Sequence, residues 1–180
     1  DPVRYLGNRS TGRMGFAVAA EAIARGARVI LISGPTSLDP PVAAEMVQVR
    51  SAEQMHAAVL ARVAQADAVI MAAAVADYTP TAGPLIGKLH KEEGNLTVNL
   101  RRTPDILGEL GRRRAGEAVP ILVGFAAETS DVVERARQKL VAKQLDLVVA
   151  NDVAQPDTGF ACDTNAASLV TADGVEEVPL

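Results

Sequence analysis

The chain has no tryptophan, and aromatic residues of any kind make up only 3% of its 180 residues. A surface that binds nucleic acid by stacking bases needs such side chains. The formal net charge of -4 also argues against a broad electrostatic footprint for nucleic acid. Any phosphate site in this chain must therefore be local.

Cysteine and long apolar runs are also scarce. Cys162 is the single cysteine, so it cannot form an internal disulfide, and no Cys/His cluster has the spacing of a zinc site. No apolar run reaches the ~18 residues of a membrane span, and the first residues lack the pattern of a secretory signal. We therefore expect a cytoplasmic protein that contacts neither membrane nor nucleic acid.

Lysine is rare beside arginine, with 4 lysines and 14 arginines. Lys88 and Lys91 lie in an irregular segment, whereas Lys139 and Lys143 have the i, i+4 spacing that places both on one helix face. An ordinary charged surface would explain either pair. Both pairs together favour a polyphosphate ligand, because a flexible ammonium can close over a phosphate.

Helix-like and strand-like segments alternate along the chain. Helical spacing occurs over 13–25, about 52–65 with Ser51 as N-cap, and near 131–143; the apolar runs of buried strands are 28–33, 68–74, 121–125 and 145–150. This alternation predicts one α/β domain with a mostly parallel sheet and helices on both faces. Segment 79–102 breaks the pattern, which predicts a flap or hairpin excursion with a half-exposed strand at 95–100.

The glycine-rich stretch near the start of the chain leads into the first predicted helix. Gly7 and Gly12 have the spacing of a P-loop, but Arg13-Met14 follows where that motif has Lys and then Ser or Thr. The Gly-x-Gly-x-x-Gly pattern of a dinucleotide loop is also absent. Backbone N–H groups at the helix start could bind an anion. A helix cap by Ser10 or Thr11 explains the stretch equally well.

Two further features admit a functional and a structural interpretation. Asp77 follows the run at 68–74, and the carboxyl ends of parallel strands are where such folds bind ligands. It could hold a ribose hydroxyl, a base edge or a metal ion, although a turn or cap is the commoner role of a lone aspartate. The run Arg112-Arg113-Arg114 is most simply the solvated end of a helix.

Eight motifs occur in a fixed order along nearly the whole chain. They are DPVRYLGNRSTGRMGFA, SGPTSL, AAAVADY, KLHK, TPDIL, VGFAAET, KLVAKQLDLVVAND and GFACDTN. The set resembles the phosphopantothenoylcysteine synthetase family, the phosphopantothenate-cysteine ligases of coenzyme A biosynthesis. It is most similar to the bacterial form, which is commonly fused behind a flavin-dependent phosphopantothenoylcysteine decarboxylase.

The resemblance implies a Rossmann-like fold, a homodimer and a two-step ligase reaction. CTP in the bacterial form, with Mg2+, activates the carboxylate of 4'-phosphopantothenate as an acyl-cytidylate, and pyrophosphate leaves. The amine of L-cysteine then attacks, giving 4'-phosphopantothenoylcysteine and CMP. The animal form uses ATP instead.

The family's functional positions can be carried over onto this chain by their motifs. Asn8 falls on the residue that supports conversion of the acyl intermediate, and Lys88 on the one that neutralises charge as pyrophosphate departs. The substrate and intermediate loop comprises Arg4, Asn8, Gly12, Met14 and Gly15. The nucleotide-binding positions are Met71, Ala72, Ala73, Asp77, Lys88, Thr103, Pro104, Asp105, Ile106, Phe125, Lys139 and Lys143. The resemblance assigns no metal ligands.

The chain also departs from the family pattern. A first strand with its Gly-Gly-Thr loop before DPVR and a C-terminal helix are missing, so we expect a single ligase domain over 1–180 that lacks both. Thr103 replaces an Asn and His90 a Lys. A non-catalytic CTP-binding or dimerisation fragment is therefore the alternative, while the absent Gly-x-Gly-x-x-Gly counts against a Rossmann oxidoreductase.

Overall fold

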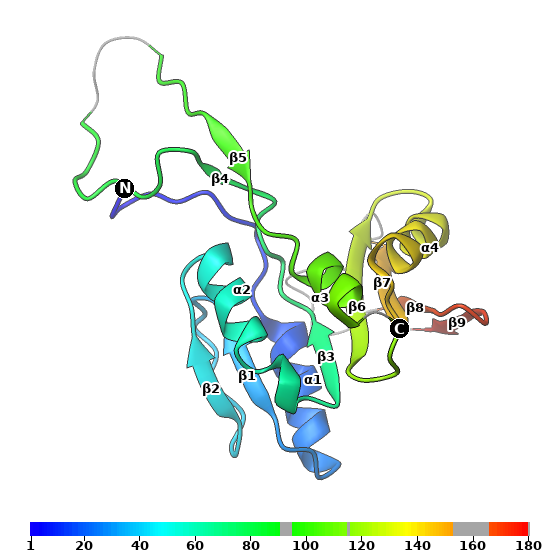
Figure 1. The fold of residues 1–180 in the computed structure, drawn as a ribbon. Helices are drawn as coiled ribbons and strands as arrows, with labels where there is room; N and C mark the ends of the chain where they lie inside the picture. Colours follow the sequence, from blue (N-terminus) through cyan, green and yellow to red (C-terminus); the bar gives the residue numbers. More distant parts are fainter. Residues whose placement is uncertain (91–94, 115, 153–165, 180) are drawn as a thin grey trace.

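The computed structural model describes residues 1–90, 95–114, 116–152 and 166–179 (Figure 1). The helices are α1 (Arg13–Ala24), α2 (Ala52–Leu60), the short 3-10 helix η1 (Val63–Gln65), α3 (Ile106–Arg114) and α4 (Val132–Lys143). The strands are β1 (Ile30–Ser33), β2 (Glu45–Gln48), β3 (Ala68–Met71), β4 (Tyr78–Pro80), β5 (Leu100–Arg102), β6 (Ile121–Glu128), β7 (Leu147–Asp152), β8 (Ala167–Val170) and β9 (Val175–Val178).

The main sheet has five strands in the order β3-β6-β7-β8-β9. Strands β3, β6 and β7 are parallel, whereas β8 and β9 are antiparallel additions at one edge. A separate parallel pair is formed by β1 and β2, and β4 pairs with β5 in the antiparallel sense. The predicted α/β fold with a parallel-rich sheet is confirmed.

Helices cover both faces of the main sheet, as predicted. Leu122 and Ala126 of β6 belong to a buried cluster that also takes in residues of α2, α3 and α4. Phe16 of α1 and Val123 of β6 are buried but lie outside that cluster. Because successive strand side chains point to opposite faces, α1 covers the face opposite the other three helices.

A buried arginine ties together the elements at the amino ends of β6 and β7. Arg114 is ion-paired with Asp146 and donates to the carbonyl of Gln144 at 2.7 Å. The Asp146 carboxylate also accepts the N–H of Leu122 at 2.7 Å. The prediction that this run ends a helix is confirmed, but a solvated Arg114 is wrong, since its side chain is only 10% exposed.

The predicted excursion at 79–102 is confirmed as an arm. It leaves the body of the molecule through β4 and returns through β5, and the N-terminal segment runs beside it (Figure 1). The half-exposed strand expected over 95–100 is wrong except at Leu100, where β5 begins. Pairing through Tyr78 and Arg102 fixes the base of the arm, while residues 95–99 form no strand.

Several predicted boundaries differ from those of the structure. The helix expected over about 52–65 is divided into α2 and η1, and the strand expected over 68–74 ends at Met71. Ser51 does cap α2, because its hydroxyl accepts the N–H of Gln54 at 3.2 Å. The N-cap of α1 is Gly12, in the left-handed conformation at φ 85, rather than Ser10 or Thr11.

Candidate functional site

The segment after β3 is held in place by hydrogen bonds that two other residues donate to its backbone carbonyl groups. The side-chain amide of Asn8 donates to the carbonyls of Ala74 at 3.0 Å and Val75 at 3.3 Å. From the other side, Thr103 donates its hydroxyl to Ala76 O at 2.7 Å and its N–H to Asp77 O at 2.9 Å. Four consecutive carbonyls are thus fixed by two residues that are far apart in the sequence.

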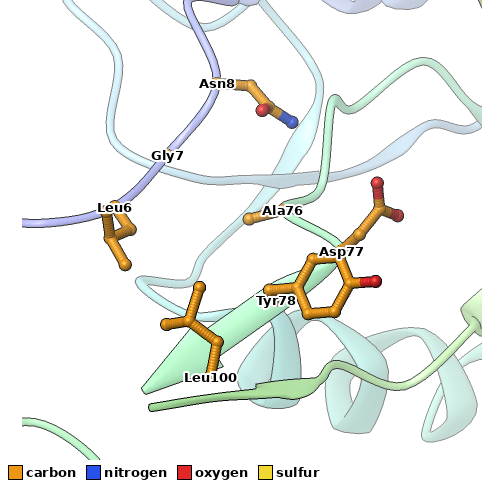
Figure 2. Close-up of a pocket in the computed structure, with 7 residues that line it drawn as sticks. All are labelled: Leu6, Gly7, Asn8, Ala76, Asp77, Tyr78 and Leu100. Carbon is orange, nitrogen blue, oxygen red and sulfur yellow. The ribbon is translucent and has the colours of Figure 1, made fainter. Parts of the chain in front are cut away.

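A cavity of about 260 Å³ lies where the N-terminal segment faces this held segment (Figure 2). Figure 2 shows the Asn8 amide on the N-terminal segment and the Asp77 carboxylate on the segment after β3. The lining residues are Leu6, Gly7, Asn8, Ala76, Asp77, Tyr78 and Leu100. A cavity of this size is smaller than most ligand sites, so it could hold only part of a nucleotide.

The start of α1 adjoins the end of β3. A methyl group on Gly15 would lie 3.6 Å from the Cβ of Ala72, so the first turn of α1 packs beside the residues that follow Met71. Gly12 precedes that turn at a positive φ that side chains rarely adopt. The structure therefore brings two groups of predicted positions together, the loop of Gly12, Met14 and Gly15 and the run 71–73.

Lys139 reaches from α4 to the backbone of β6. Its Nζ donates to the carbonyl of Phe125 at 2.5 Å, and the side chain is partly buried. Burial, and next the charge of Lys143, lower the pKa of Lys139, while the carboxylates of Glu128, Asp105 and Asp77, in that order, act in the opposite direction. Four of the predicted nucleotide-binding side chains therefore share one electrostatic field.

Lys143 is paired with Asp105 at the start of α3. The Nζ of Lys143 lies 2.7 Å from Oδ1 of Asp105, and the same oxygen accepts the N–H of Gly108 at 3.1 Å. Burial raises the pKa of Asp105, but the hydrogen bonds from Lys143 and Gly108 outweigh it and hold that pKa below its usual value. The neighbouring Ile106 is 3% exposed, so any ligand contact there would involve its backbone.

Lys88 and Arg4 lie apart from this group. Lys88 is exposed in the arm and is not among the residues that line the cavity. Arg4 is ion-paired with Asp1 and donates to the carbonyl of Leu89 at 2.7 Å. Lys91 and Cys162 lie outside the described residues.

The described parts of the chain contain no group of three or more His, Cys, Asp or Glu side chains that could hold a metal ion. No helix in those parts is long and apolar enough to cross a membrane.

Four of the residues that line the cavity were not predicted as site residues. They are Leu6, Ala76, Tyr78 and Leu100, and nothing in their spacing distinguishes them from other residues of the chain. Thr103, which was predicted to be a nucleotide-binding position, also holds the backbone of Ala76 and Asp77. A hydroxyl supplies that contact without an amide group.

The fold and this edge define a class, the α/β domains that bind ligands at the carboxyl ends of parallel strands. Within that class, the chain belongs to the family described as DNA/pantothenate metabolism flavoprotein C-terminal domain, whose family model matches residues 1–180. This confirms the resemblance carried by the eight motifs.

The relatives agree with the family assignment. The chain is 50% identical over 182 residues to the coenzyme A biosynthesis bifunctional protein CoaBC of Bacillus subtilis (strain 168), a match that covers 100% of this chain and 44% of that protein. The chain thus spans less than half of that relative. The crystal structure of the C-terminal domain of a CoaBC is 42% identical, with a TM-score of 0.80 over 100% of this chain and 79% of that one.

A more distant structure shares only the fold. It is a Cab2 H337A variant in complex with phosphopantothenate-cysteine, 18% identical, with a TM-score of 0.77 over 99% of this chain and 74% of that one. At this identity the comparison shows that the Rossmann-like arrangement is common to both.

Proposed function

We propose that this chain is a CTP-dependent ligase that joins 4'-phosphopantothenate to L-cysteine in coenzyme A biosynthesis. The proposal rests above all on the cavity between Asn8 and Asp77, which unites two of the positions implied by the motifs. The identity with a bifunctional coenzyme A biosynthesis protein over the whole chain supports it. The products would be 4'-phosphopantothenoylcysteine, CMP and pyrophosphate.

The reaction needs positioned charge more than it needs a nucleophilic side chain. A carboxylate oxygen of 4'-phosphopantothenate attacks the α-phosphorus of CTP, and the bond to pyrophosphate breaks. The cysteine amine then attacks the acyl carbon, CMP leaves and the amine proton is released to solvent. Both steps build negative charge on oxygen, so donors and cations aimed at those oxygens lower the barrier.

The residues at the site suit these roles. Lys139 lies beside the middle of β6 and Lys143 beside the start of α3, where a triphosphate could replace their present partners Phe125 O and Asp105. Asn8 can donate a hydrogen bond to a developing acyl oxygen without titrating. Lys88 would meet the departing pyrophosphate from the arm.

Magnesium fits as a companion of the nucleotide. The exposed carboxylate of Asp77 would hold the ion together with phosphate oxygens and water, because the described residues provide no preformed cage. When bound, Mg2+ would neutralise charge on the triphosphate. The preference for CTP over ATP follows from the bacterial type of the motifs, with Phe125 placed against the base.

A homodimer is part of the proposal. The arm and the N-terminal segment expose apolar side chains, including Tyr5 at 92%, Ile86 at 99% and Leu96 at 68%. Exposed apolar patches of this kind mark interaction surfaces. A second copy of the chain would cover them.

Fusion to a flavin-dependent decarboxylase and a cytoplasmic location belong to the same proposal, supported by the bifunctional relative.

We further propose that the domain is completed by a strand from outside residues 1–180. Among the described residues, β1 pairs only with β2, and β3 pairs only with β6 on one side, so each keeps one edge without a strand neighbour. A parallel strand between those edges would join the two sheets. A C-terminal helix beyond β9 would complete the family's arrangement.

The test is pyrophosphate release with 4'-phosphopantothenate and Mg2+, comparing CTP with ATP, before and after L-cysteine is added. Release that requires phosphopantothenate and favours CTP, followed by cysteine-dependent product, is the expected result. CTP binding by folded protein without release would support the non-catalytic fragment instead. Binding of NAD or NADP would support an oxidoreductase.

Replacing Lys88 tests its role within the same assay. Lys88→Gln should slow pyrophosphate release by at least about tenfold, the scale of a lost charge contact in a transition state. Thermal stability should hardly change, because Lys88 is exposed. Arg25→Gln is the matched control, since Arg25 is an exposed cation paired with Glu21 at the far end of α1. If thermal stability collapses while the remaining folded enzyme turns over normally, Lys88 is structural, and normal turnover with unchanged stability would remove Lys88 from the mechanism.

A further inference from the structure

Asp1 is unusual among the residues of the N-terminal segment. Its side chain is 1% exposed, whereas that of its partner Arg4 is 57% exposed. The carboxylate accepts the N–H groups of Val3 and Arg4, each at 3.0 Å, and pairs with the Arg4 guanidinium, whose Nε lies 3.0 Å away. A desolvated carboxylate with this many donors is a rigid acceptor.

The partner of this acceptor on the arm is the backbone of Leu89. The N–H of Leu89 donates to Oδ2 of Asp1 at 3.1 Å, and the carbonyl of Leu89 accepts from Arg4 Nη2 at 2.7 Å. The first contact lies in the peptide unit that joins Lys88 to Leu89. The chain is therefore held on both sides of Leu89, directly beside Lys88.

The arm near Lys88 has little else to restrain it. Gly83 and Gly87 precede Lys88, a Cβ on either would meet nothing within 4 Å, and the side chain of Ile86 is 99% exposed. A lysine side chain also carries ~2 kcal/mol of rotamer entropy, which must be lost when its ammonium is placed on a phosphate. If the backbone at Lys88 is already fixed, less backbone entropy has to be lost when the ammonium binds a phosphate.

We propose that Asp1 is a positioning residue that, together with Arg4, sets the placement of Lys88. The inference rests on the proposed function, in which Lys88 meets the departing pyrophosphate. The segment that holds Leu89 also carries Asn8 to the cavity, four residues after Arg4. The N-terminal segment therefore positions both candidate catalytic side chains. It carries Asn8 itself, and it holds Lys88 through the peptide that joins Lys88 to Leu89.

The first test needs no turnover. Trypsin cleaves after lysine, and the Lys88–Leu89 bond is the peptide unit held by Asp1. Asp1→Ala should cleave several-fold faster at this bond than wild type under native conditions, with the cut located by mass spectrometry. Glu21→Ala is the control, because it also removes an acid from an arginine pair, but on the surface of α1. Equal cleavage of wild type and Asp1→Ala would overturn the proposal.

The second test is a double-mutant cycle on pyrophosphate release. Asp1→Ala should slow release by tenfold or more, since a misplacement of about 1 Å can cost ~100-fold. Once Lys88→Gln has removed the ammonium, adding Asp1→Ala should cost little more, because residues that act through one another are not additive. Fully multiplicative losses would show that Asp1 acts independently of Lys88 and would overturn the proposal.

A conservative variant guards against misfolding. Asp1→Asn keeps an oxygen for the N–H of Leu89 but removes the charge that holds Arg4, so its losses in both tests should be intermediate. Pyrophosphate release at the wild-type rate by both Asp1→Asn and Asp1→Ala would overturn this inference but not the ligase proposal. A folded wild type that releases no pyrophosphate would refute the ligase proposal, and this inference would fall with it.

Discussion

Replacing Asn8 by aspartate exchanges a hydrogen-bond donor for an anion at the centre of the site. The Asn8 amide now donates to Ala74 O at 3.0 Å and Val75 O at 3.3 Å. A carboxylate cannot donate, so it would instead face two carbonyl oxygens. The two lost bonds are worth about 1 kcal/mol each, so the loss of stability should not exceed about 2 kcal/mol plus a solvent-screened repulsion. For a chain of this length that is a fall in Tm of about 4–8 °C.

The effect on activity should be much larger than the effect on stability. Released from Asn8, the backbone of Ala74 and Val75 can shift relative to Asp77, whose carbonyl Thr103 still holds. A displacement of about 1 Å at a reacting site can cost ~100-fold. We therefore expect Asn8→Asp to lower the rate of acyl-cytidylate formation by about 100-fold while the protein stays folded at 25 °C.

Single-turnover quench experiments with CTP and 4'-phosphopantothenate would measure that rate, and thermal unfolding would measure the stability. Asn8→Ala separates two roles for this residue. A positioning role predicts that Asn8→Ala also slows formation of the intermediate, whereas a purely oxyanion-stabilising role predicts a loss confined to its reaction with cysteine. Normal formation of the intermediate by both variants would refute the reasoning from the carbonyl contacts.

Two further predictions concern the helices that carry the remaining candidate residues. Lys139→Met should be more stable than wild type at pH 7, because burial lowers the pKa of Lys139 in the folded state. Between that lowered pKa and the unfolded value of about 10.4, unfolded wild type binds more protons than folded wild type, so wild-type stability rises with pH. The stability difference between Lys139→Met and wild type should therefore shrink, and urea unfolding from pH 7 to 10 would measure it. Gly111→Ala should destabilise α3, because its new Cβ would lie 2.0 Å from the carbonyl oxygen of Lys143. The strain, about 1–3 kcal/mol or more, exceeds the ~1 kcal/mol that alanine adds to a helix, so a lower urea midpoint is expected.

Each of these two predictions has an outcome that contradicts it. A stability difference between Lys139→Met and wild type that is independent of pH would show that burial of the charge is not its cause. For Gly111→Ala the control is Gly15→Ala, whose Cβ would make an ordinary contact of 3.6 Å with Ala72 and should be neutral or stabilising. If both alanine variants are stabilised, α3 and α4 are packed less closely than the structure indicates.

Much of the parallel core was predictable from the sequence because its strands are short, continuous apolar runs. The runs at 121–125 and 145–150 became β6 and β7, which are covered on both faces and therefore carry no polar alternation. The hairpin of β8 and β9 was not predicted, although Asp173-Gly174 between two short β-like runs is a recognised turn signal. Strand β2 is only half-buried and lacks any comparable signal.

The site was predictable in part, since Asp77 was expected beyond the end of a strand and lines the cavity. The family resemblance supplied Asn8, but not its partners. The contacts of Asn8 and Thr103 with carbonyls after β3 depend on how three separate segments meet, and no local pattern encodes that meeting. For the same reason, no sequence pattern predicts the contact between Asp1 and the arm.

The pair of the nearly buried Arg114 side chain and the exposed Asp146 joins the amino ends of β6 and β7, whereas the cavity lies beyond the carboxyl end of β3. Exchange of backbone amides with deuterium should therefore be graded along these strands. Slow exchange is expected near Leu122, and faster exchange toward Glu128, where local opening breaks fewer contacts. A sheet anchored at one end in this way can let its other end open and close around a ligand without global unfolding.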